Sequence, residues 1–386
     1  MKLVKILALS VFFQTSLLFC QIFCCEPTLF NAEQKNLGLD FPKGIQTYTV
    51  FEPSPQDKKG DKFCNGAVIT EFKGALYCQW QSSLCDEDSQ DTHVVYSISK
   101  DDGKTWCKPL NLANCDKKHF RSSGGWWVYN DTLIAYINEW QTNSKLRQGV
   151  TKFCTTKDGI KWSKLKSVKM IDGSPLRAIF EQDPHLISSN RILGAAHFQK
   201  GLFVCPIFTD DLSGVRGWQK AEFSATDGKN NTSVELEPSL FTRKDNSIVM
   251  IFRDQASSFK KLASISYDSG SSWSTVQKTD FPDARTKQSA GNLPDGTAFL
   301  VCCPQNSAFR YPLVLALSSD GFTFNRAFLL RDEQGLPSLK YSGKAKSQGF
   351  HYAKSAVLDT NLYTAYSVNK ESIQITVVPL NSLIEE

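Results

Sequence analysis

Five places in this chain carry side chains suited to acid, base or nucleophilic chemistry. The acidic segment 86–91 offers carboxyl groups, Glu237 opens one apolar segment, and Arg253 ends the next. Arg310 and Tyr352 precede two later apolar segments. A tyrosine hydroxyl has a pKa of about 10, so it reacts at neutral pH only with a base beside it. Nucleophilic chemistry at Tyr352 therefore requires a carboxylate from elsewhere in the chain.

Each of these places also has a structural interpretation. Segment 86–91 has the composition of a solvated surface loop, and its spacing lacks the glycine and the terminal glutamate of a helix-loop-helix calcium site. Arg253 is followed by Asp254, a local ion-pair partner. A single tyrosine such as Tyr352 is more often a core or rim residue than a nucleophile. The residues taken one at a time leave both interpretations open.

No metal or cofactor site is expected. The five histidines show no metal-ligand spacing, and Cys302-Cys303 is not a CxxC motif. The sequence contains no nucleotide-binding fingerprint and no GxSxG elbow. Trp126, in Gly124-Gly-Trp-Trp127, is either a platform on which a sugar ring stacks or a buried packing residue. The chemistry is therefore expected to come from side chains alone.

A repeated turn motif indicates the elements that must position these residues. Ser99-Lys-Asp-Asp-Gly-Lys-Thr-Trp106 returns as Ser266-Tyr-Asp-Ser-Gly-Ser-Ser-Trp273, with a hydroxyl and an Asp that hydrogen-bond a tight turn and a Gly that accepts positive φ. Looser copies begin at Thr156, Thr209 and Ser318, so the hydroxyl positions lie 57, 53, 57 and 52 residues apart. Strand-rich repeats of about this length are typical of propeller blades of four strands.

The predicted fold is all-β, a six-bladed β-propeller of four-stranded antiparallel blades. Five turns indicate five blades, and the segments before the first turn and after the last supply a sixth blade closed by strands from both ends of the chain. The Asp residues of the repeated turns are occupied in holding those turns. Function is therefore expected on the strand starts and loops that converge on the propeller axis.

Composition is typical of a globular protein with a large core. The 386 residues are 41% hydrophobic, and the net charge of +5 is spread along the chain, so no nucleic-acid partner is expected. Residues 1–25 have the basic end and apolar run of a signal peptide, and 26–386 are predicted to form a single propeller domain. A secreted protein is predicted, with a signal anchor as the alternative. No later segment is apolar for long enough to span a membrane.

A secretory route has two covalent consequences. Asn130, Asn230 and Asn231 lie in acceptor sequons for N-glycosylation, although chance explains such sequons equally well. Removal of residues 1–25 leaves nine cysteines, of which Cys107 and Cys115 are the nearest plausible disulfide partners.

The spacing of the candidate residues resembles that of the sialidase superfamily, whose propellers carry the repeated turns as Asp boxes. In that superfamily an acid/base Asp commonly stands eleven residues before the first box, and Asp88 stands eleven residues before Ser99. A Glu precedes one carboxylate-binding Arg by about sixteen residues, as Glu237 precedes Arg253. The nucleophilic Tyr opens a segment that Tyr352-Ala-Lys-Ser resembles.

The resemblance implies a role for each residue. Asp88 is implied as the acid/base, Tyr352 as the nucleophile and Glu237 as its base, with Arg253 and Arg310 on a substrate carboxylate. The implied protein is a secreted exo-glycosidase that removes a terminal acidic sugar, sialic acid by preference, from glycans with retention. The alternatives are a propeller glycosidase or lyase for another sugar, and a non-catalytic propeller that binds glycans.

The family pattern fails at one place. Sialidases usually open the first blade with a FRIP-like motif whose Arg is a third carboxylate ligand, but this chain has Phe63-Cys64-Asn65-Gly66. Loss of that Arg weakens carboxylate binding by roughly 1.5–3 kcal/mol if nothing replaces it. Arg121 and Lys346 are the candidate replacements.

Overall fold

The computed structural model describes residues 21–31, 34, 36–182, 184–188 and 190–384. Within these residues the helical segments are two short 3-10 turns, Lys229–Asn231 and Leu380–Leu383, and the remaining elements are strands. None of the described helices has the length and apolar character needed to cross a membrane. The predicted all-β class is confirmed.

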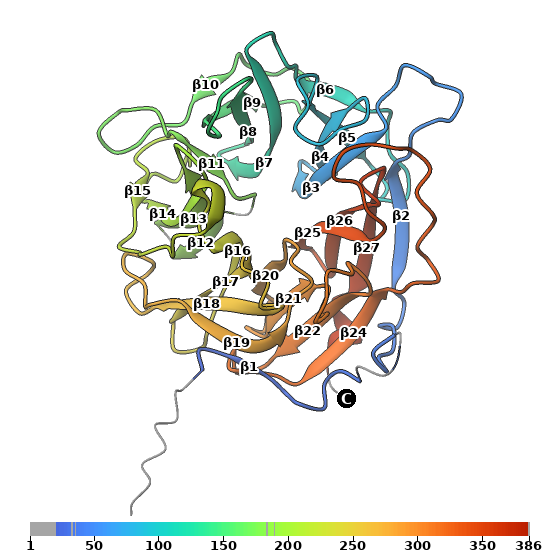
Figure 1. Ribbon diagram of the computed structural model, residues 1–386, viewed down its shortest axis with the longest axis vertical. Coiled ribbons are helices and arrows are strands. Elements are labelled where there is room, and N and C mark those ends of the chain that lie inside the picture. The colour runs from blue at the N-terminus through green and yellow to red at the C-terminus, as the bar shows by residue number, and fades with distance from the viewer. Residues whose placement is uncertain (1–20, 32–33, 35, 183, 189, 385–386) are drawn as a thin grey trace, which may run out of the picture.

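Six antiparallel sheets surround a central axis, and the innermost strand of each sheet lies nearest the centre of the ring (Figure 1). The first three blades, each given from the inner to the outer strand, are β3 (Phe63–Phe72), β4 (Ala75–Ser83), β5 (His93–Ser99) and β6 (Leu110–Ala113); β7 (His119–Tyr129), β8 (Thr132–Gln141), β9 (Gly149–Thr156) and β10 (Lys166–Ser167); and β11 (Ala178–Phe180) with β12 (His185–Ser188), β13 (Arg191–Phe198), β14 (Phe203–Thr209) and β15 (Gln219–Lys220).

The inner position of blade three is divided, because β11 and β12 both pair with β13. Blades four to six are β16 (Glu235–Thr242), β17 (Ile248–Asp254), β18 (Lys260–Ser266) and β19 (Gln277–Pro282); β20 (Ser289–Asn292), β21 (Ala298–Cys302), β22 (Leu313–Ser318) and β24 (Arg326–Arg331); and β25 (Phe350–Leu358), β26 (Asn361–Val368), β27 (Ser372–Pro379) and β2 (Gln46–Phe51).

Both ends of the chain build blade six. Its outer strand β2 comes from the N-terminal part and pairs antiparallel with β27 near the C-terminus. This arrangement confirms the predicted closure. The pairing of β2 with β27 joins the N-terminal and C-terminal parts of the chain in one sheet. Six four-stranded blades therefore form a complete ring.

The repeated turns lie between the third and fourth strands of blades one to five. In blade one, Ser99 Oγ donates to Asp101 at 2.8 Å and accepts from the Gly103 backbone N–H at 2.9 Å, while Trp106 Nε1 donates to Gly103 O at 2.8 Å. Gly103 has φ +87°, and a Cβ there would meet Ile375 of blade six at 2.5 Å. The turn glycine is therefore needed both for its backbone and for blade packing.

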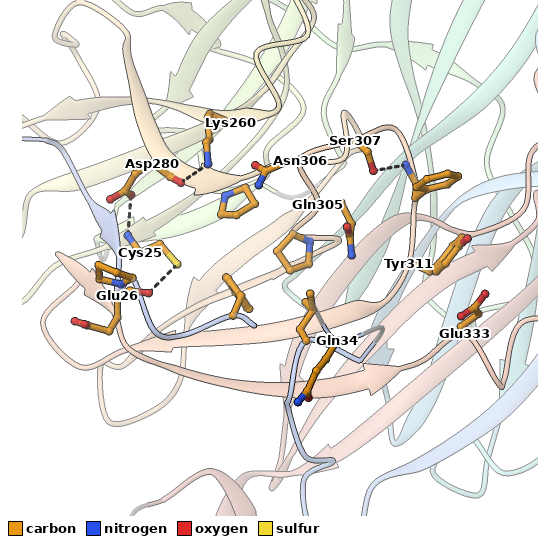
Figure 2. Close-up of a pocket in the computed structure, with 16 residues that line it drawn as sticks. Cys25, Glu26, Gln34, Lys260, Asp280, Gln305, Asn306, Ser307, Tyr311 and Glu333 are labelled. Carbon is orange, nitrogen blue, oxygen red and sulfur yellow. Dashed lines mark hydrogen bonds between the residues drawn. The ribbon is translucent and has the colours of Figure 1, made fainter. Parts of the chain in front are cut away.

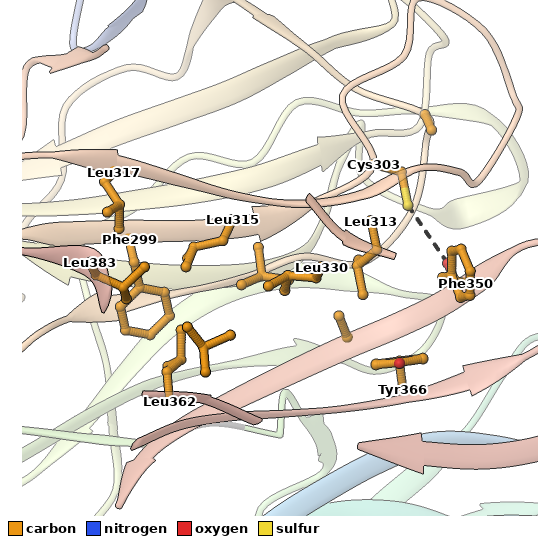
Figure 3. Packing of buried hydrophobic residues seen from close by; sticks show 14 of the residues in the cluster. Phe299, Cys303, Leu313, Leu315, Leu317, Leu330, Phe350, Leu362, Tyr366 and Leu383 are labelled. Carbon is orange, nitrogen blue, oxygen red and sulfur yellow. Dashed lines mark hydrogen bonds between the residues drawn. The ribbon is translucent and has the colours of Figure 1, made fainter. Parts of the chain in front are cut away.

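The hydrophobic core is divided among the seams between neighbouring blades. Figure 3 shows the seam between blades five and six, where Leu315, Phe350 and Tyr366 are buried. Comparable clusters fill the other five seams. Full burial of one Leu or Phe side chain contributes about 1.5–3 kcal/mol. Each blade is therefore stabilised by its neighbours.

A segment near the N-terminus packs against the outside of blades four and five. Phe23 is 1% exposed and lies against Phe241, Phe281 and Phe324, and β1 (Cys24–Cys25) pairs in parallel with β23 (Thr323–Phe324). Residues 1–20 of the predicted signal peptide lie outside the described residues. Its last residues, 22–25, are part of this packed segment.

Cys107 and Cys115, the nearest plausible disulfide partners in the sequence, are not paired in the structure. Both residues carry free thiols, as do the other cysteines within the described chain. The Cys107 Sγ lies instead 3.5 Å from Ser97 Oγ, beside the first repeated turn.

Candidate active site

Irregularities in the innermost strands aim side chains at the axis. The pairing register shifts after Leu236 in β16 and after His351 in β25, and the next residues, Glu237 and Tyr352, have φ of +51° and +57°. Such β-bulges bend a strand and re-aim the side chain at the bulge. Two separate blades therefore present a carboxylate and a phenol from equivalent irregularities.

A central cavity of about 330 Å³ brings four of the sequence-predicted residues together. Asp88, Glu237, Arg253 and Tyr352 all line it. They come from blades one, four and six, which are far apart in the chain. The structure therefore places the implied acid, base, nucleophile and one arginine around a single space.

Glu237 and Tyr352 both line this cavity, and the charge of the carboxylate acts on the phenol. Arg253 Nη1 donates to Glu237 Oε2 at 2.9 Å. Burial by itself raises the pKa of Glu237, but the charges of Arg253 and Lys287 outweigh it and hold that pKa well below its usual range. Burial and then the charge of Glu237 raise the pKa of Tyr352. At rest a neutral phenol faces an ionised carboxylate.

Cations surround the Tyr352 ring. Lys287 Nζ, Lys370 Nζ and the Arg310 guanidinium carbon lie 5.3, 5.6 and 5.8 Å from the ring centroid. Positive charges at this distance stabilise negative charge on the phenol oxygen more than they stabilise the neutral form. These cations therefore oppose the rise in the pKa of Tyr352 that burial and the charge of Glu237 cause.

Asp88 lies on the loop between β4 and β5, with φ +57°. Its carboxylate forms an ion pair with Arg147 Nη2 at 2.5 Å, and Arg147 belongs to the loop between β8 and β9. The neighbouring Glu87 accepts from Lys370 Nζ at 2.8 and 2.9 Å. The acidic loop is therefore held from blade two and from blade six, so it is a fixed wall of the cavity rather than a free surface loop.

A buried polar group supports Glu237 from blades three and five. Glu181 lies 2.9 Å from His197 Nδ1 and 2.7 Å from Lys287 Nζ, and each of these side chains is less than 10% exposed. The other ring nitrogen, His197 Nε2, accepts from the Glu237 backbone N–H at 3.4 Å. These contacts hold the backbone that bears Glu237.

Three arginines, Arg253, Arg285 and Arg310, lie close to one another near Glu237 and Tyr352. Arg310 donates to the Arg285 carbonyl at 3.1 Å and to His351 Nδ1 at 2.9 Å. Burial and then the like charges of Arg253 and Arg310 lower the pKa of Arg285. The Nε atoms of Arg253 and Arg285 are buried without a hydrogen-bond partner in the described structure. Crowded guanidinium groups with unused donors suit a bound anion.

Arg310 lies beside the Tyr352 ring but does not line the central cavity, and three other sequence-predicted residues also lie outside it. Arg121 forms an ion pair with Glu139 at 2.6 Å, and Trp126 is buried between blades one and two with Nε1 donating to Val68 O at 3.0 Å. Lys346 Nζ donates to Lys62 O at 2.6 Å. Arg121 and Lys346 are thus committed to structural partners, and the packing interpretation of Trp126 is the one that its burial fits.

Sequence reasoning missed the lysines and the supporting group. Lys287 and Lys370 follow no motif, and their partners lie on other blades. The one available signal was Lys370 itself, a lysine in the three-residue connection 369–371 between β26 and β27, where turn residues such as Gly or Asn are usual. Arg147 and His197 gave no signal in the sequence.

A larger cavity lies elsewhere. It measures about 720 Å³ and is lined by the N-terminal segment and by residues of blades four and five (Figure 2). Burial and then Asp280 raise the pKa of its Cys25 thiol to about 12, which disfavours the reactive thiolate. Lys260 donates to the Asp280 carbonyl at 3.0 Å. None of the sequence-predicted catalytic residues lines this space.

The described residues contain no cluster of side chains typical of a metal site. Among the residues that the structure describes, no three His, Cys, Asp or Glu side chains gather as a metal site would require. The arrangement supports acid, base and nucleophilic chemistry by side chains next to an anion-binding group.

Comparison with known families and proteins gives two results. A family model described as a BNR repeat-like domain matches residues 74–364, which is most of the chain. A comparison with curated proteins finds no match.

Solved structures share the architecture at low identity. A sialidase has a TM-score of 0.67 and 17% identity over 93% of this chain, which spans 35% of that sialidase. A protein of unknown function from Dyadobacter fermentans has a TM-score of 0.66 and 15% identity, covering 87% of this chain and 99% of its own. A Trypanosoma rangeli sialidase in complex with sialic acid has values of 0.63 and 13%, covering 89% and 60%. These identities show a sialidase-like propeller fold alone.

Proposed function

This chain belongs to the BNR repeat-like domain family, and we propose that its central cavity cleaves a terminal acidic sugar, sialic acid by preference, from a glycan with retention. The observation that carries this proposal is the convergence of Tyr352, Glu237 and Asp88 on one cavity, with Arg253 bonded to the Glu237 carboxylate. A binding protein needs an anion site but has no need of a phenol paired with a base. Secretion of the protein is part of the same proposal.

The proposed reaction has two steps. In the first, the Tyr352 oxygen bonds to the anomeric carbon, its proton passes to Glu237, and the bond to the leaving oxygen breaks as Asp88 protonates that oxygen. In the second, water attacks the anomeric carbon and gives a proton to Asp88, while the departing Tyr352 oxygen regains its proton from Glu237. Each step inverts the anomeric carbon, so the product retains the original configuration.

Charge explains the choice of nucleophile. A substrate with a carboxylate at the anomeric carbon would repel an attacking carboxylate, whereas a neutral phenol approaches freely. As the proton moves to Glu237, negative charge moves toward Lys287, Arg310 and Lys370. These cations compensate for the low basicity that Arg253 imposes on Glu237.

The substrate carboxylate has a site in spite of the missing motif arginine. Arg253, Arg285 and Arg310 supply three clustered guanidinium groups. The Cys64 backbone N–H donates to the Lys370 carbonyl at 2.9 Å, so Lys370 stands beside the position at which the family motif places its arginine. We propose that Arg253 and Arg310 bind the carboxylate, with Lys370 as the nearby cation.

One contact favours a second candidate function. Asp88 is paired with Arg147 at 2.5 Å, so its carboxylate already has a partner within the protein and is not free to face a leaving oxygen. If this pair persists with a glycan bound, the cavity binds acidic sugars without cleaving them. Binding of a sialoside without turnover would identify this second function.

Hydrolysis of an aryl sialoside tests the proposal. Wild type is expected to release the aryl group with retention, which proton NMR of the first-formed sugar anomer reports. Tyr352→Phe is expected to lower kcat by at least about 10³-fold, since it removes the nucleophile, and Glu237→Gln by about 10²–10⁴-fold. Equal rates for wild type and Tyr352→Phe contradict the proposed nucleophile.

A matched control separates loss of the nucleophile from loss of a tyrosine hydroxyl in general. Tyr363 lies on β26 of the same blade, is 4% exposed and does not line the central cavity. Tyr363→Phe is therefore expected to keep the wild-type rate. A comparable loss in both variants points to damage of blade six instead of lost chemistry.

A further inference from the structure

The larger cavity lies at the same end of the propeller as the central one. One of its walls is segment 304–311, which joins β21 to β22, the second and third strands of blade five. Asp88 and Arg147 lie on the equivalent loops of blades one and two. Strands alternate in direction within each blade, so loops between second and third strands all lie at one end of the ring. Asp280 and Pro282 belong to the outermost strand of blade four, so the larger cavity lies nearer the rim than the centre.

Segment 304–311 contributes side chains to both parts of this face. The Arg310 guanidinium carbon lies 5.8 Å from the centroid of the Tyr352 ring, so this side chain is directed toward the centre. Its two neighbours, Phe309 and Tyr311, line the larger cavity. Successive side chains of an extended chain point to opposite sides, which explains this division. One segment therefore gives an arginine to the anion site and two aromatic rings to the larger cavity.

The aromatic rings of this segment form an exposed surface. Phe309 is 61% exposed, and its ring centroid lies 5.8 Å from that of Tyr311, with the ring planes at 43°. Phe30 of the N-terminal segment lines the same cavity. Full burial of a Phe ring contributes about 1.5–3 kcal/mol, so a ligand that covers Phe309 gains binding free energy from it. A sugar ring has an apolar face of C–H groups that packs on an aromatic ring in this way.

The same segment supplies neutral hydrogen-bonding groups beside these rings. Gln305, Asn306 and Ser307 line the cavity, and Figure 2 shows all three around it. The Phe309 backbone N–H donates to Ser307 Oγ at 3.4 Å, a bond that orders the segment. Amide and hydroxyl groups both donate and accept, as sugar hydroxyls do. Aromatic rings next to amides therefore match both kinds of surface that a sugar presents.

Acidic groups outnumber basic ones in the lining. Glu26, Asp280 and Glu333 bring three carboxylates, and Lys260 brings one ammonium group. That ammonium group donates to the Asp280 carbonyl at 3.0 Å, and Asp280 Oδ1 accepts from the Cys25 backbone N–H at 2.8 Å. Like charges repel, so the lining disfavours a sugar that bears a carboxylate, whereas carboxylates accept hydrogen bonds from neutral hydroxyls. The larger cavity thus has the opposite charge preference to the cluster of three arginines.

We infer that the larger cavity is a second carbohydrate site and that it binds a neutral sugar. Its volume of about 720 Å³ lies within the range of about 300–1,000 Å³ that is typical of small-molecule sites. Asp88, Glu237 and Tyr352 do not line it, so the inference goes beyond the proposed function and does not depend on it. Two sites on one face bind a surface rich in glycans more tightly than either site alone, because the first contact raises the effective concentration for the second.

Binding of neutral disaccharides tests the inference. The probes are lactose, chitobiose and mannobiose, each added to the wild-type protein at up to about 10 mM, and saturation-transfer NMR reports which sugar protons contact the protein. Saturation of at least one disaccharide is expected, with a Kd on the order of 1 mM. Phe309→Ala is expected to weaken this binding about tenfold, and Asn306→Ala to weaken it as well. Absence of saturation for all three disaccharides overturns the inference, as does binding that neither variant weakens.

Phe41→Ala is the matched control. Phe41 is 46% exposed, and it lines neither the larger nor the central cavity. The variant removes an exposed phenyl ring, as Phe309→Ala does, so it is expected to keep the wild-type Kd. Equal weakening by Phe41→Ala and Phe309→Ala assigns the effect to the loss of a surface ring in general and contradicts the site.

An acidic disaccharide tests the preference for a neutral sugar separately. A disaccharide of glucuronic acid and N-acetylglucosamine is expected to bind the larger cavity more weakly than the neutral probes, because its carboxylate meets three others. Tighter binding that Phe309→Ala abolishes contradicts the assignment to neutral sugars. If wild type cleaves no sialoside, the proposed function fails, while the neutral disaccharides still decide this inference.

Discussion

At the scale of single residues, the three proposed catalytic groups share a backbone conformation that non-glycine residues seldom adopt. Asp88, Glu237 and Tyr352 have φ of +57°, +51° and +57°. Each such residue costs on the order of 1–3 kcal/mol. The irregularities in the inner strands of blades one and two carry Gly66 and Gly125 instead. The chain thus bears this cost where a side chain is needed and uses glycine where none is.

His351 next to the nucleophile links stability to pH. It is fully buried, its Nδ1 accepts from Arg310 and its Nε2–H donates to Ser347 O at 2.9 Å. Burial and then the charges of Arg310 and Lys370 lower its pKa well below the usual value of about 6.5. Below that pH the unfolded chain binds a proton that the folded one does not. Stability is therefore retained above about pH 6.5 and lost as pH falls.

The expected loss is up to about 1.4 kcal/mol of unfolding free energy per pH unit below 6.5. His351→Gln keeps one donor and one acceptor and does not titrate, so its unfolding free energy is expected to fall less steeply between pH 6.5 and 5. Urea titrations of both proteins across this range measure the difference. Parallel curves would contradict a neutral buried histidine.

At the scale of elements, each repeated turn also locks its blade to the preceding one. The turn glycines of blades one to five would each place a Cβ within 3 Å of a residue on the blade before; these contacts join Gly103 to Ile375, Gly159 to Tyr77, Gly214 to Tyr136, Gly270 to Leu193 and Gly321 to Arg243. A side chain at these positions disturbs a seam as well as a turn.

Gly270→Ala tests this second role. Gly270 has φ +82°, and a Cβ would lie 2.6 Å from the fully buried Leu193. Gly296 has φ +87° with nothing within 4 Å, so Gly296→Ala has the same backbone cost of about 1–2 kcal/mol and no clash. Gly270→Ala is expected to lose about 1–3 kcal/mol more than Gly296→Ala in urea unfolding, because overpacking adds to the backbone cost. Equal losses would assign the glycine to the turn alone.

The sequence could predict the elements that are specified by residues close to one another in the chain. A hydroxyl, an Asp and a Gly within five residues specify the repeated turn, and their spacing specified the blades. Asp88, Glu237 and Tyr352 could be proposed because the spacing in the sialidase superfamily is measured along the chain, and the structure places all three around one cavity. Lys287 was not, since it reaches its partner Gln182 across 105 residues.

Arg121 and Lys346, the two candidates to replace the missing motif arginine, were wrongly chosen for the same reason: their partners are distant in sequence. Arg121 was chosen for its charge, but its partner Glu139 lies directly across the β7–β8 pair, which the sequence did not reveal. The boundary at residue 25 stays a prediction for a similar reason. An apolar run reads alike whether it is a leader or, as at Phe23, a packed segment.

At the scale of the whole molecule, the packed N-terminal segment joins the outer parts of blades four and five. Phe23→Ala removes a ring that contacts three other buried aromatic rings and is expected to cost about 3–5 kcal/mol of unfolding free energy. Phe41 is 46% exposed, so Phe41→Ala is the matched control, with an expected cost within about 1 kcal/mol. A chain that begins at residue 26 is expected to lose at least as much as Phe23→Ala. Full stability of that shorter chain would show the segment to be dispensable.

The pairing of β2 with β27 also has a consequence for synthesis. Gln46 pairs with Val377, so 377 − 46 = 331 residues of synthesis separate the two partners of this ladder. Throughout the interval the nascent chain exposes a strand edge that can pair with other chains, and contacts so distant in sequence form slowly. The period of greatest risk of wrong pairing is therefore translation, before β27 has emerged from the ribosome.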